Sequence, residues 1–175
     1  MSNKQALREL QQRLAQRMQA AREQPQPASW LAVEAGPVPL LFPLRQAAEI
    51  FTPVPLKAVP YTQPWLLGVA NLRGGLHTVV DLAAFLGLRE AGARAEPGQS
   101  RLVTVNPDLN SHCALLVDRL LGLRGDEQLQ PEEGGATAGR PRFAGPLLRD
   151  PQGRRWQVLD LEALVKHEQF LRIVA

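Results

Sequence analysis

The feature that most constrains this chain is the run from Gly68 to Leu82, which reads GVANLRGGLHTVVDL. Its first half is apolar, and its second half alternates with the period of two that is typical of β-strands. Between the halves, Gly74 and Gly75 allow a tight bend, because glycine adopts backbone angles that other residues resist. The run therefore predicts a β-hairpin that presents Arg73 at the entrance to the bend.

Composition limits the class of protein. The 175 residues suffice for one domain, or for two small subdomains that share a core. The one cysteine, Cys113, lies in an apolar run, so we expect no disulfide within the chain and no cysteine metal cluster. We find no signal-peptide core and no stretch that approaches about 20 apolar residues. These observations predict a cytoplasmic protein without direct membrane insertion.

The charge balance argues against binding to nucleic acid. Although the sequence pI is about 9.6, 20 basic residues against 17 acidic ones leave a net charge of only +3. Aromatic residues, on which bases would stack, make up 5% of the chain. One group of five arginines comes near to a basic patch, but Asp150 interrupts it, so we interpret the group as a solvated face. Its members are Arg140, Arg142, Arg149, Arg154 and Arg155. The alternative from another functional class is a small β-barrel that binds nucleic acid.

Residues 1–28 are predicted to be a helix followed by a linker. Apolar residues recur at spacings of three and four between Asn3 and Gln24, which is typical of an amphipathic helix. The prolines of Pro25-Gln26-Pro27 then end the helix, because proline disfavours helical geometry at the residue before it. We expect this helix to pack on the domain or on a partner rather than to form a stable self-dimer.

The remaining residues, 29–175, predict a mainly β domain of the sandwich or barrel type, because many short apolar runs are separated by turn residues. The Gly-, Ala- and Pro-rich segment 92–100 is the expected boundary between two subdomains. These are about 29–91 and 101–160, followed by a C-terminal helix over 161–172. Hairpins are expected over 30–42, 101–117 and 143–159, with Leu120–Arg124 continuing the sheet of the second hairpin.

The inventory for catalysis is poor, which favours a protein that is not an enzyme. The three histidines, His77, His112 and His167, are far apart in sequence and fall in three different predicted elements. Cys113 has apolar neighbours, which raise the pKa of a thiol and suppress the reactive thiolate. The spacings of metal ligands and the glycine-rich motifs that hold phosphates are missing. We expect no cofactor and no metal.

Several signature residues have a structural interpretation. Asp81 and Asp118 follow apolar strands, where a carboxylate usually accepts hydrogen bonds from backbone N–H groups. Gly68 and Gly74 are expected to allow close approach of the backbone or a positive φ angle. Glu49 and Arg73 differ, because neither charge suits a buried strand unless it is paired. For these two we expect an ion pair, contact with a partner, or both.

The chain resembles the CheW-like domain, the coupling-protein fold of bacterial chemosensory arrays, over roughly Trp30 to Leu171. Four segments carry the resemblance: Gly68-Val69-Ala70-Asn71-Leu72-Arg73-Gly74 with Asp81-Leu82, Ala48-Glu49-Ile50, Leu115-Leu116-Val117-Asp118, and Trp156-Gln157-Val158-Leu159-Asp160-Leu161. The resemblance implies two five-stranded SH3-like barrel subdomains that share an apolar interface. Asn71 and Leu72 belong to the same structural signature as Gly74.

The resemblance also implies a function. CheW-like proteins bind the signalling tip of a methyl-accepting chemoreceptor and the regulatory domain of a CheA-type histidine kinase, and they carry no chemistry of their own. The implied receptor groove lies between the subdomains, and its candidate residues are Ala47, Glu49, Gly68, Arg73, Leu102 and Val103. The segment Phe42-Pro43-Leu44 and the N-terminal helix resemble the coupling protein of type IV pilus (twitching motility) systems. Flagellar chemotaxis stays open.

Overall fold

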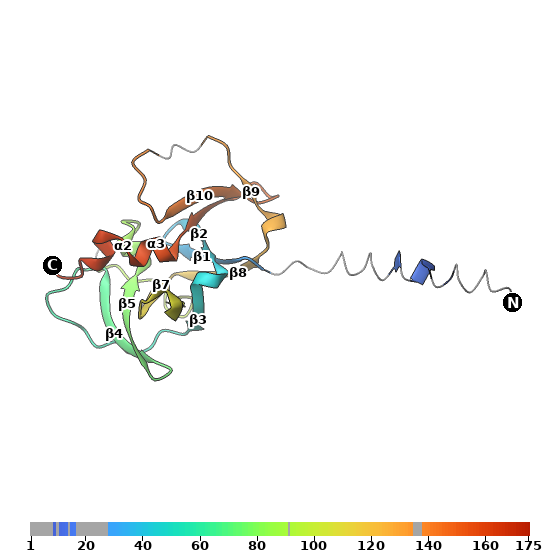
Figure 1. Cartoon of the computed structure of the whole chain (residues 1–175). Coiled ribbons are helices and arrows are strands. Elements are labelled where there is room, and N and C mark those ends of the chain that lie inside the picture. The colour runs from blue at the N-terminus through green and yellow to red at the C-terminus, as the bar shows by residue number, and fades with distance from the viewer. Residues whose placement is uncertain (1–8, 10, 14, 17–27, 91, 135–137) are drawn as a thin grey trace.

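The computed structural model describes residues 9, 11–13, 15–16, 28–90, 92–134 and 138–175. Within these residues, eleven strands form one six-stranded and one five-stranded sheet, so the expected mainly β fold is confirmed. Figure 1 shows the two sheets one above the other, with the short helices α2 (Leu82–Phe85) and α3 (Leu161–Val165) at the level where they meet.

The six-stranded sheet has the strand order β8-β1-β2-β11-β10-β9. β1 and β2 form the expected first hairpin, and β11 pairs with β2 in parallel. The resemblance implied five strands, and the sixth, β9, is only two residues long. The strands are β1 (Trp30–Ala35), β2 (Val38–Pro43), β8 (Arg119–Arg124), β9 (Gln130–Pro131), β10 (Ala144–Arg149) and β11 (Arg155–Leu159).

The five-stranded sheet has the order β3-β6-β7-β5-β4, so β3 and β4 are its two edges. The predicted signature hairpin is present as β4 and β5, and β5 also pairs in parallel with β7. The strands are β3 (Ala47–Phe51), β4 (Leu66–Leu72), β5 (Gly75–Asp81), β6 (Arg101–Val105) and β7 (Cys113–Val117). Short 3₁₀ turns precede or follow the strands: η1 (Leu44–Gln46), η2 (Pro107–Leu109) and η3 (Asp126–Gln128).

The main apolar core lies between the sheets, because both sheets contribute buried side chains to it, for example Phe42 and Leu115. Each sheet also has a smaller core of its own, around Trp156 in the six-stranded sheet and around Leu102 in the five-stranded one. Strands that bury both faces need near-continuous apolar sequence, and β6, with four consecutive buried residues, has it. Each sheet therefore curves around its own interior while sharing the main core.

The segment 92–100 does not separate the strands of one sheet from those of the other. The five-stranded sheet takes its strands from both sides of that segment, and β1 and β2 join the later strands β8 to β11. The sheets therefore do not coincide with the ranges 29–91 and 101–160. The expectation that Leu120–Arg124 continues the sheet of β6 and β7 is wrong, because β8 pairs with β1 instead. An alternating pattern specifies a strand but not the neighbour with which it pairs.

The C-terminal helix predicted over 161–172 is divided into α3 and α4 (Glu168–Leu171). His167 begins the second helix, where its Nδ1 accepts a hydrogen bond from the backbone N–H of Gln169 at 3.3 Å. At the other end of the chain, the described residues 9, 11–13 and 15–16 are helical and exposed. The rest of the predicted helix over 3–24 lies outside the described residues.

Arg89 joins the ends of β5 and β7 and, through Asp118, links them to the turn between β1 and β2. Its guanidinium Nη1 lies 2.8 Å from Asp81 Oδ2 at the end of β5, and its Nη2 contacts Asp118, which follows β7. Asp81 also accepts the backbone N–H of Ala84 at 3.1 Å and so begins α2. Asp118 accepts the backbone N–H of Gly36, in the turn between β1 and β2. Both carboxylates thus accept backbone N–H groups, as the sequence predicts.

Gln46 provides a second polar link. Its side chain is buried, and its Nε2 donates to Asp160 Oδ1 at 3.0 Å while its Oε1 accepts the backbone N–H of Leu161 at 2.8 Å. The end of η1 is thereby held against the start of α3. Because both polar atoms of the buried amide have partners, this link avoids the cost of an unsatisfied buried group.

Replacing Arg89 by alanine is expected to destabilise the fold by about 3 kcal/mol, because it leaves two largely buried carboxylates without their shared cation. The side chains of Arg89, Asp81 and Asp118 are only 11%, 5% and 16% exposed. Urea unfolding followed by tryptophan fluorescence measures this loss. The matched control is Arg172→Ala, which removes an exposed ion pair with Glu168 and should cost under about 1 kcal/mol. Equal losses in the two variants would contradict the role given to Arg89.

Candidate partner-binding site

The bend of the signature hairpin holds Arg73 in a fixed, exposed position. Leu72 pairs with Gly75, so only Arg73 and Gly74 form the loop, and both have positive φ angles, of 48° and 81°. Positive φ at both central residues is the property of the type I′ turn, which matches the twist of a hairpin. Asn71 Oδ1 accepts the Gly74 backbone N–H at 2.9 Å and stabilises the bend.

Glu49 is presented by an irregularity in the edge strand β3. The pairing of β3 with β6 shifts between Ala47 and Ile50, so the ladder does not pair Glu49 regularly. The hydroxyl of Thr104 compensates, because it accepts the Glu49 N–H at 2.9 Å and donates to the Glu49 carbonyl at 3.2 Å. Such bulges often re-aim a side chain. Thr104, which is buried, was not identified from sequence, because a threonine within an apolar strand carries no distinguishing signal.

The predicted ion pair between these two residues is present. Arg73 Nη1 lies 2.9 Å from Glu49 Oε2, and the side chains are 75% and 43% exposed. The pair joins the edge strand β3 to the hairpin of the opposite edge strand β4, so it spans the opening of the curved sheet. Exposed pairs of this kind contribute only about 0–1 kcal/mol to stability, so the pair stabilises the fold little and presents two charges to solvent.

The other candidate residues lie mostly below the surface. Leu102 and Val103 are both buried, the first in the interior of the five-stranded sheet and the second in the main core. Gly68 is also buried, and Ala47 is half-buried against the main core. The structure therefore brings Glu49 and Arg73 together at the surface, whereas Gly68, Leu102 and Val103 lie in the scaffold below.

Two exposed apolar side chains on the same elements were not identified from the sequence. Ile50, next to Glu49 on β3, is 46% exposed, and Leu76, which pairs with Asn71 beside the bend, is 66% exposed. Alternation along a strand predicts which residues share a face, but it does not show which face is left uncovered. The strands that hold the ion pair thus also expose two apolar side chains.

Groups with catalytic potential are not assembled among the described residues. His77 and His112 are neighbours, with ring centroids 6.0 Å apart, because β5 and β7 are paired, whereas His167 packs on Phe143. No group of three or more His, Cys, Asp or Glu side chains that could hold a metal ion occurs in this part of the chain. Nor is any described helix long and apolar enough to cross a membrane.

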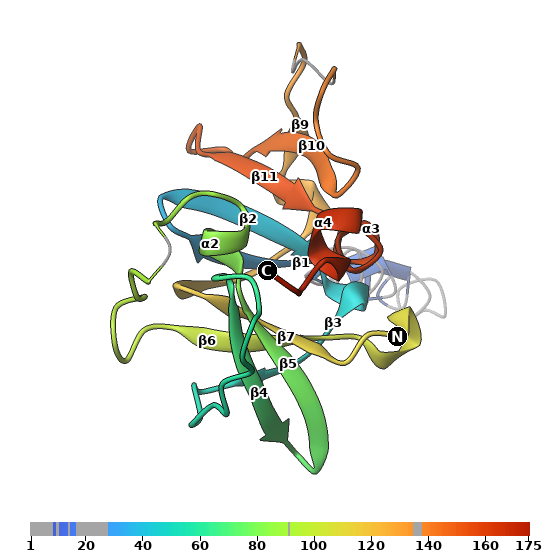
Figure 2. The same cartoon turned by 90° about the vertical axis from the view of Figure 1, so that its left-hand side faces the viewer.

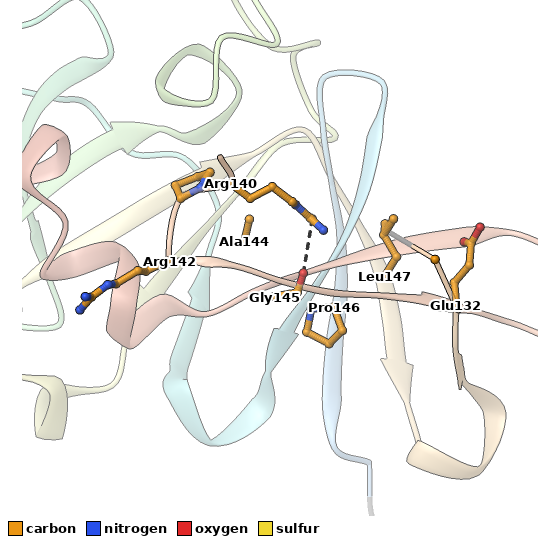
Figure 3. A pocket seen from close by; sticks show the side chains of 9 residues that line it. Glu132, Arg140, Arg142, Ala144, Gly145, Pro146 and Leu147 are labelled. Carbon is orange, nitrogen blue, oxygen red and sulfur yellow. Dashed lines mark hydrogen bonds between the residues drawn. The ribbon is translucent and has the colours of Figure 1, made fainter. Parts of the chain in front are cut away.

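A cavity of about 530 Å³ lies beside β10 (Figure 3). β10 belongs to the six-stranded sheet, whereas the ion pair belongs to the five-stranded one. Arg140 lines it, donates to the carbonyl of Gly145 at 3.4 Å and contacts the side-chain oxygen of Gln157. Gln157 also donates to the Gly145 carbonyl, at 2.8 Å. These contacts support the irregular start of β10, where its pairing with β11 shifts, so we assign Arg140 a structural role.

Comparison with known proteins decides the family. The family model described as the CheW-like domain matches residues 29–169. The chain belongs to the CheW-like domain family. The resemblance seen in the signature hairpin is thereby confirmed, and the CheW-like domain accounts for both sheets and for α3.

Two known proteins and one solved structure are similar to this CheW-like protein. Protein PilI of Pseudomonas aeruginosa is 29% identical over 167 residues, which cover 92% of this chain and 88% of PilI. A probable chemotaxis protein CheW of Rhizobium etli is 30% identical over 123 residues, 69% of this chain and 76% of that protein. The crystal structure of scaffolding protein TtCheW from Thermoanaerobacter tengcongensis superposes with a TM-score of 0.65 at 19% identity, covering 82% of this chain and 96% of that one.

Two glycines of the signature should respond differently to alanine. A Cβ at Gly68 would lie 2.4 Å from the carbonyl oxygen of Lys57, which belongs to the segment bridged to Val69, and φ there is +141°. A Cβ at Gly74 meets nothing within 4 Å, so only its φ of +81° opposes alanine. We expect Gly74→Ala to cost about 1 kcal/mol and Gly68→Ala clearly more. Thermal unfolding of both variants measures this, and the reverse order would contradict the close approach at Gly68.

Cys113 should be unreactive in the folded protein. Burial raises the pKa of its thiol, and a hydrogen bond with Ser111 only partly opposes this. Because the folded state then holds the proton more tightly than the unfolded state, this thiol's contribution to stability is present at neutral pH and is lost as alkaline pH approaches the raised pKa. Iodoacetamide at pH 8 should label the native protein at least 100-fold more slowly than the protein in urea. Equal rates would contradict the burial of this thiol.

Proposed function

We propose that the protein is a non-enzymatic adaptor that couples methyl-accepting chemoreceptors to a CheA-type histidine kinase in a chemosensory array. The observation that carries the proposal is membership of the CheW-like family together with an exposed Glu49–Arg73 pair at the positions of its signature. The structurally similar TtCheW is a scaffolding protein, which supports a role in assembly rather than in chemistry.

We further propose that Glu49 and Arg73 contact the receptor tip directly, with Ala47 beside them. Gly68, Leu102 and Val103 would then act by shaping the strands beneath, since their side chains or backbone are buried. Charges held at fixed positions favour specificity over raw affinity, because a partner must match both the sign and the spacing of the pair.

The pathway is proposed to be control of type IV pilus twitching motility, supported by the similarity to PilI over 92% of the chain. Flagellar chemotaxis is the second candidate, because the match to a probable chemotaxis protein CheW has a similar identity, 30%, over a shorter stretch. Deleting the gene separates them: loss of twitching zones with normal swimming supports the pilus pathway, and the opposite result supports the flagellar one.

Direct binding tests the adaptor role. The full chain should retain the signalling tip of a receptor and the regulatory domain of a CheA-type kinase from its own genome, at micromolar concentration, which corresponds to roughly −8 kcal/mol. Binding to none of the chemosensory partners of that genome would reject the proposal. A mobility shift with DNA or RNA in the same buffer would instead favour the nucleic-acid alternative.

Charge reversal tests the site itself. Arg73→Glu and Glu49→Arg should each weaken binding of the receptor tip about tenfold, because each places two like charges at the contact, while kinase binding changes less. The double swap restores opposite charges and should recover part of the affinity. Unfolding free energies should change by about 1 kcal/mol or less, given the exposure of both side chains.

The matched control for this series is Arg172→Glu, which reverses an exposed arginine in an ion pair on α4. It should leave receptor binding unchanged. If the single charge reversals Glu49→Arg and Arg73→Glu also leave receptor binding unchanged while the fold is intact, Arg73 is a solvated turn residue and the site lies elsewhere.

A further inference from the structure

Four arginines lie at one end of the six-stranded sheet, in two groups that each surround one glutamate. Glu34 on β1 is bound by Arg119 at 3.0 Å and by Arg154 at 3.3 Å. Glu132 is bound by Arg149 at 3.1 Å and by Arg155 at 2.8 Å. We name Arg119, Arg149, Arg154 and Arg155 the arginine rim. The two turns at this end, between β1 and β2 and between β10 and β11, lie side by side in Figure 2.

The glutamates are recessed below the arginines. The side chains of Glu34 and Glu132 are 18% and 22% exposed, whereas the four arginine side chains are 44% to 58% exposed. A molecule that approaches this end therefore meets guanidinium groups before it meets carboxylates. The two carboxylates hold the four arginines in place and offset two of their charges, so the group keeps a positive excess at the surface.

Most hydrogen-bond donors of the rim are available. Among the described residues, each of the four side chains donates through a single guanidinium nitrogen, which is Nε in Arg155 and Nη2 in the other three. A guanidinium has five N–H donors in a planar fork that matches a carboxylate or a phosphate. Two nitrogens of each rim arginine are thus left for an acceptor that comes from outside.

The rim is rigid at its centre. The guanidinium of Arg154 lies 4.6 Å from the centre of the Trp156 ring, and Trp156 Nε1 donates to Asp150 Oδ2 at 3.0 Å in the adjacent turn. That hydrogen bond, with those from Arg154 and Gln152 N–H groups, lowers the pKa of Asp150. Desolvation raises the pKa of Glu132, but hydrogen bonds from Arg155 and Arg149 outweigh it, and the pKa is lowered. Asp150 and Glu132 are therefore ionised at neutral pH, where Glu132 holds Arg149 and Arg155 in place.

The sequence does not show this cluster, because Arg119 and Glu34 reach it only through the pairing of β8 with β1. Arg149, Arg154 and Arg155 are close in sequence, but Asp150 beside them suggests a neutral, solvated face. In the fold, Asp150 is engaged by Trp156, and Arg119 adds a further cation from a distant strand.

We propose that the arginine rim binds an acidic segment of a protein partner, whose carboxylates accept the free guanidinium donors. Carboxylates suit the rim because its four cations are separated by two anions, so spaced single charges match it better than a continuous phosphate backbone. Single-stranded nucleic acid would also need an exposed aromatic ring for stacking, and the ring beside Arg154, Trp156, is fully buried. The inference does not depend on the adaptor role, since the rim and the Glu49–Arg73 pair belong to different sheets.

Fluorescence anisotropy with a labelled decapeptide of glutamate, using the full chain at 50 mM NaCl, tests this proposal. The peptide should bind, and binding should weaken at least fivefold at 300 mM NaCl, because exposed charge pairs are screened. The double variants Arg119→Gln/Arg154→Gln and Arg149→Gln/Arg155→Gln should each lose at least fivefold in affinity. The control Arg45→Gln/Arg172→Gln removes the same charge elsewhere and should bind like the parent.

Since the glutamine variants leave recessed glutamates unpaired, a second series keeps the charge. Arg119→Lys/Arg154→Lys should fold normally and bind the peptide with an intermediate affinity, because lysine keeps the charge but lacks the planar fork. Equal loss in the control and the rim variants would overturn the proposal, as would an unaltered affinity in every rim variant. Tighter binding of a 20-base-pair DNA duplex, or of vesicles with anionic lipid, would assign the rim to a different class of ligand and also overturn it.

Discussion

The relation between the two sheets depends on the guanidinium of Arg89. Asp81 ends a strand of the five-stranded sheet, and Asp118 holds the backbone N–H of Gly36 in the six-stranded sheet, so one cation joins elements of both. An apolar core between two curved sheets permits small sliding movements, because the hydrophobic effect is not directional. A buried ion pair with hydrogen bonds permits one geometry. The main core thus supplies most of the stability, while the Arg89 network adds to it and fixes how the turn between β1 and β2 lies against the ends of β5 and β7.

The sequence predicts the parts of this protein that depend on neighbouring residues. The Asn71–Gly75 bend, the capping role of Asp81 and the first β-hairpin all follow from local patterns, and each is present. Sequence patterns do not predict the features that depend on which strands pair with each other. The partner of β8, the bulge in β3 that Thr104 supports, and the position of Arg89 result from pairings between distant segments. The Glu49–Arg73 pair was accessible only because the family resemblance supplied the missing neighbour.

Arginine side chains have two roles in this molecule, within the fold and at its surface, and their exposure distinguishes the two roles. Arg89 is 11% exposed and holds two carboxylates inside the fold, whereas Arg73 is 75% exposed and holds one at the surface. The rim arginines lie between these extremes. A guanidinium that is buried against its carboxylate partners is part of the scaffold, while one that keeps exposed donors can take part in recognition. Counting cations in the sequence cannot separate these cases, because each depends on what the fold brings within reach.

One sheet is nested inside the other along the chain. Residues 47–117 form the five-stranded sheet from an uninterrupted stretch, whereas the six-stranded sheet is assembled from 30–43 and 119–159. During synthesis the β1–β2 hairpin therefore emerges first, but its parallel neighbour β11 emerges only after the whole inner sheet. Long-range pairings of this kind form late and leave strand edges uncovered meanwhile. The apolar strands β1 and β2 are consequently made early but gain their parallel neighbour late, so their free edges stay open to other chains or to chaperones while the inner sheet is synthesised.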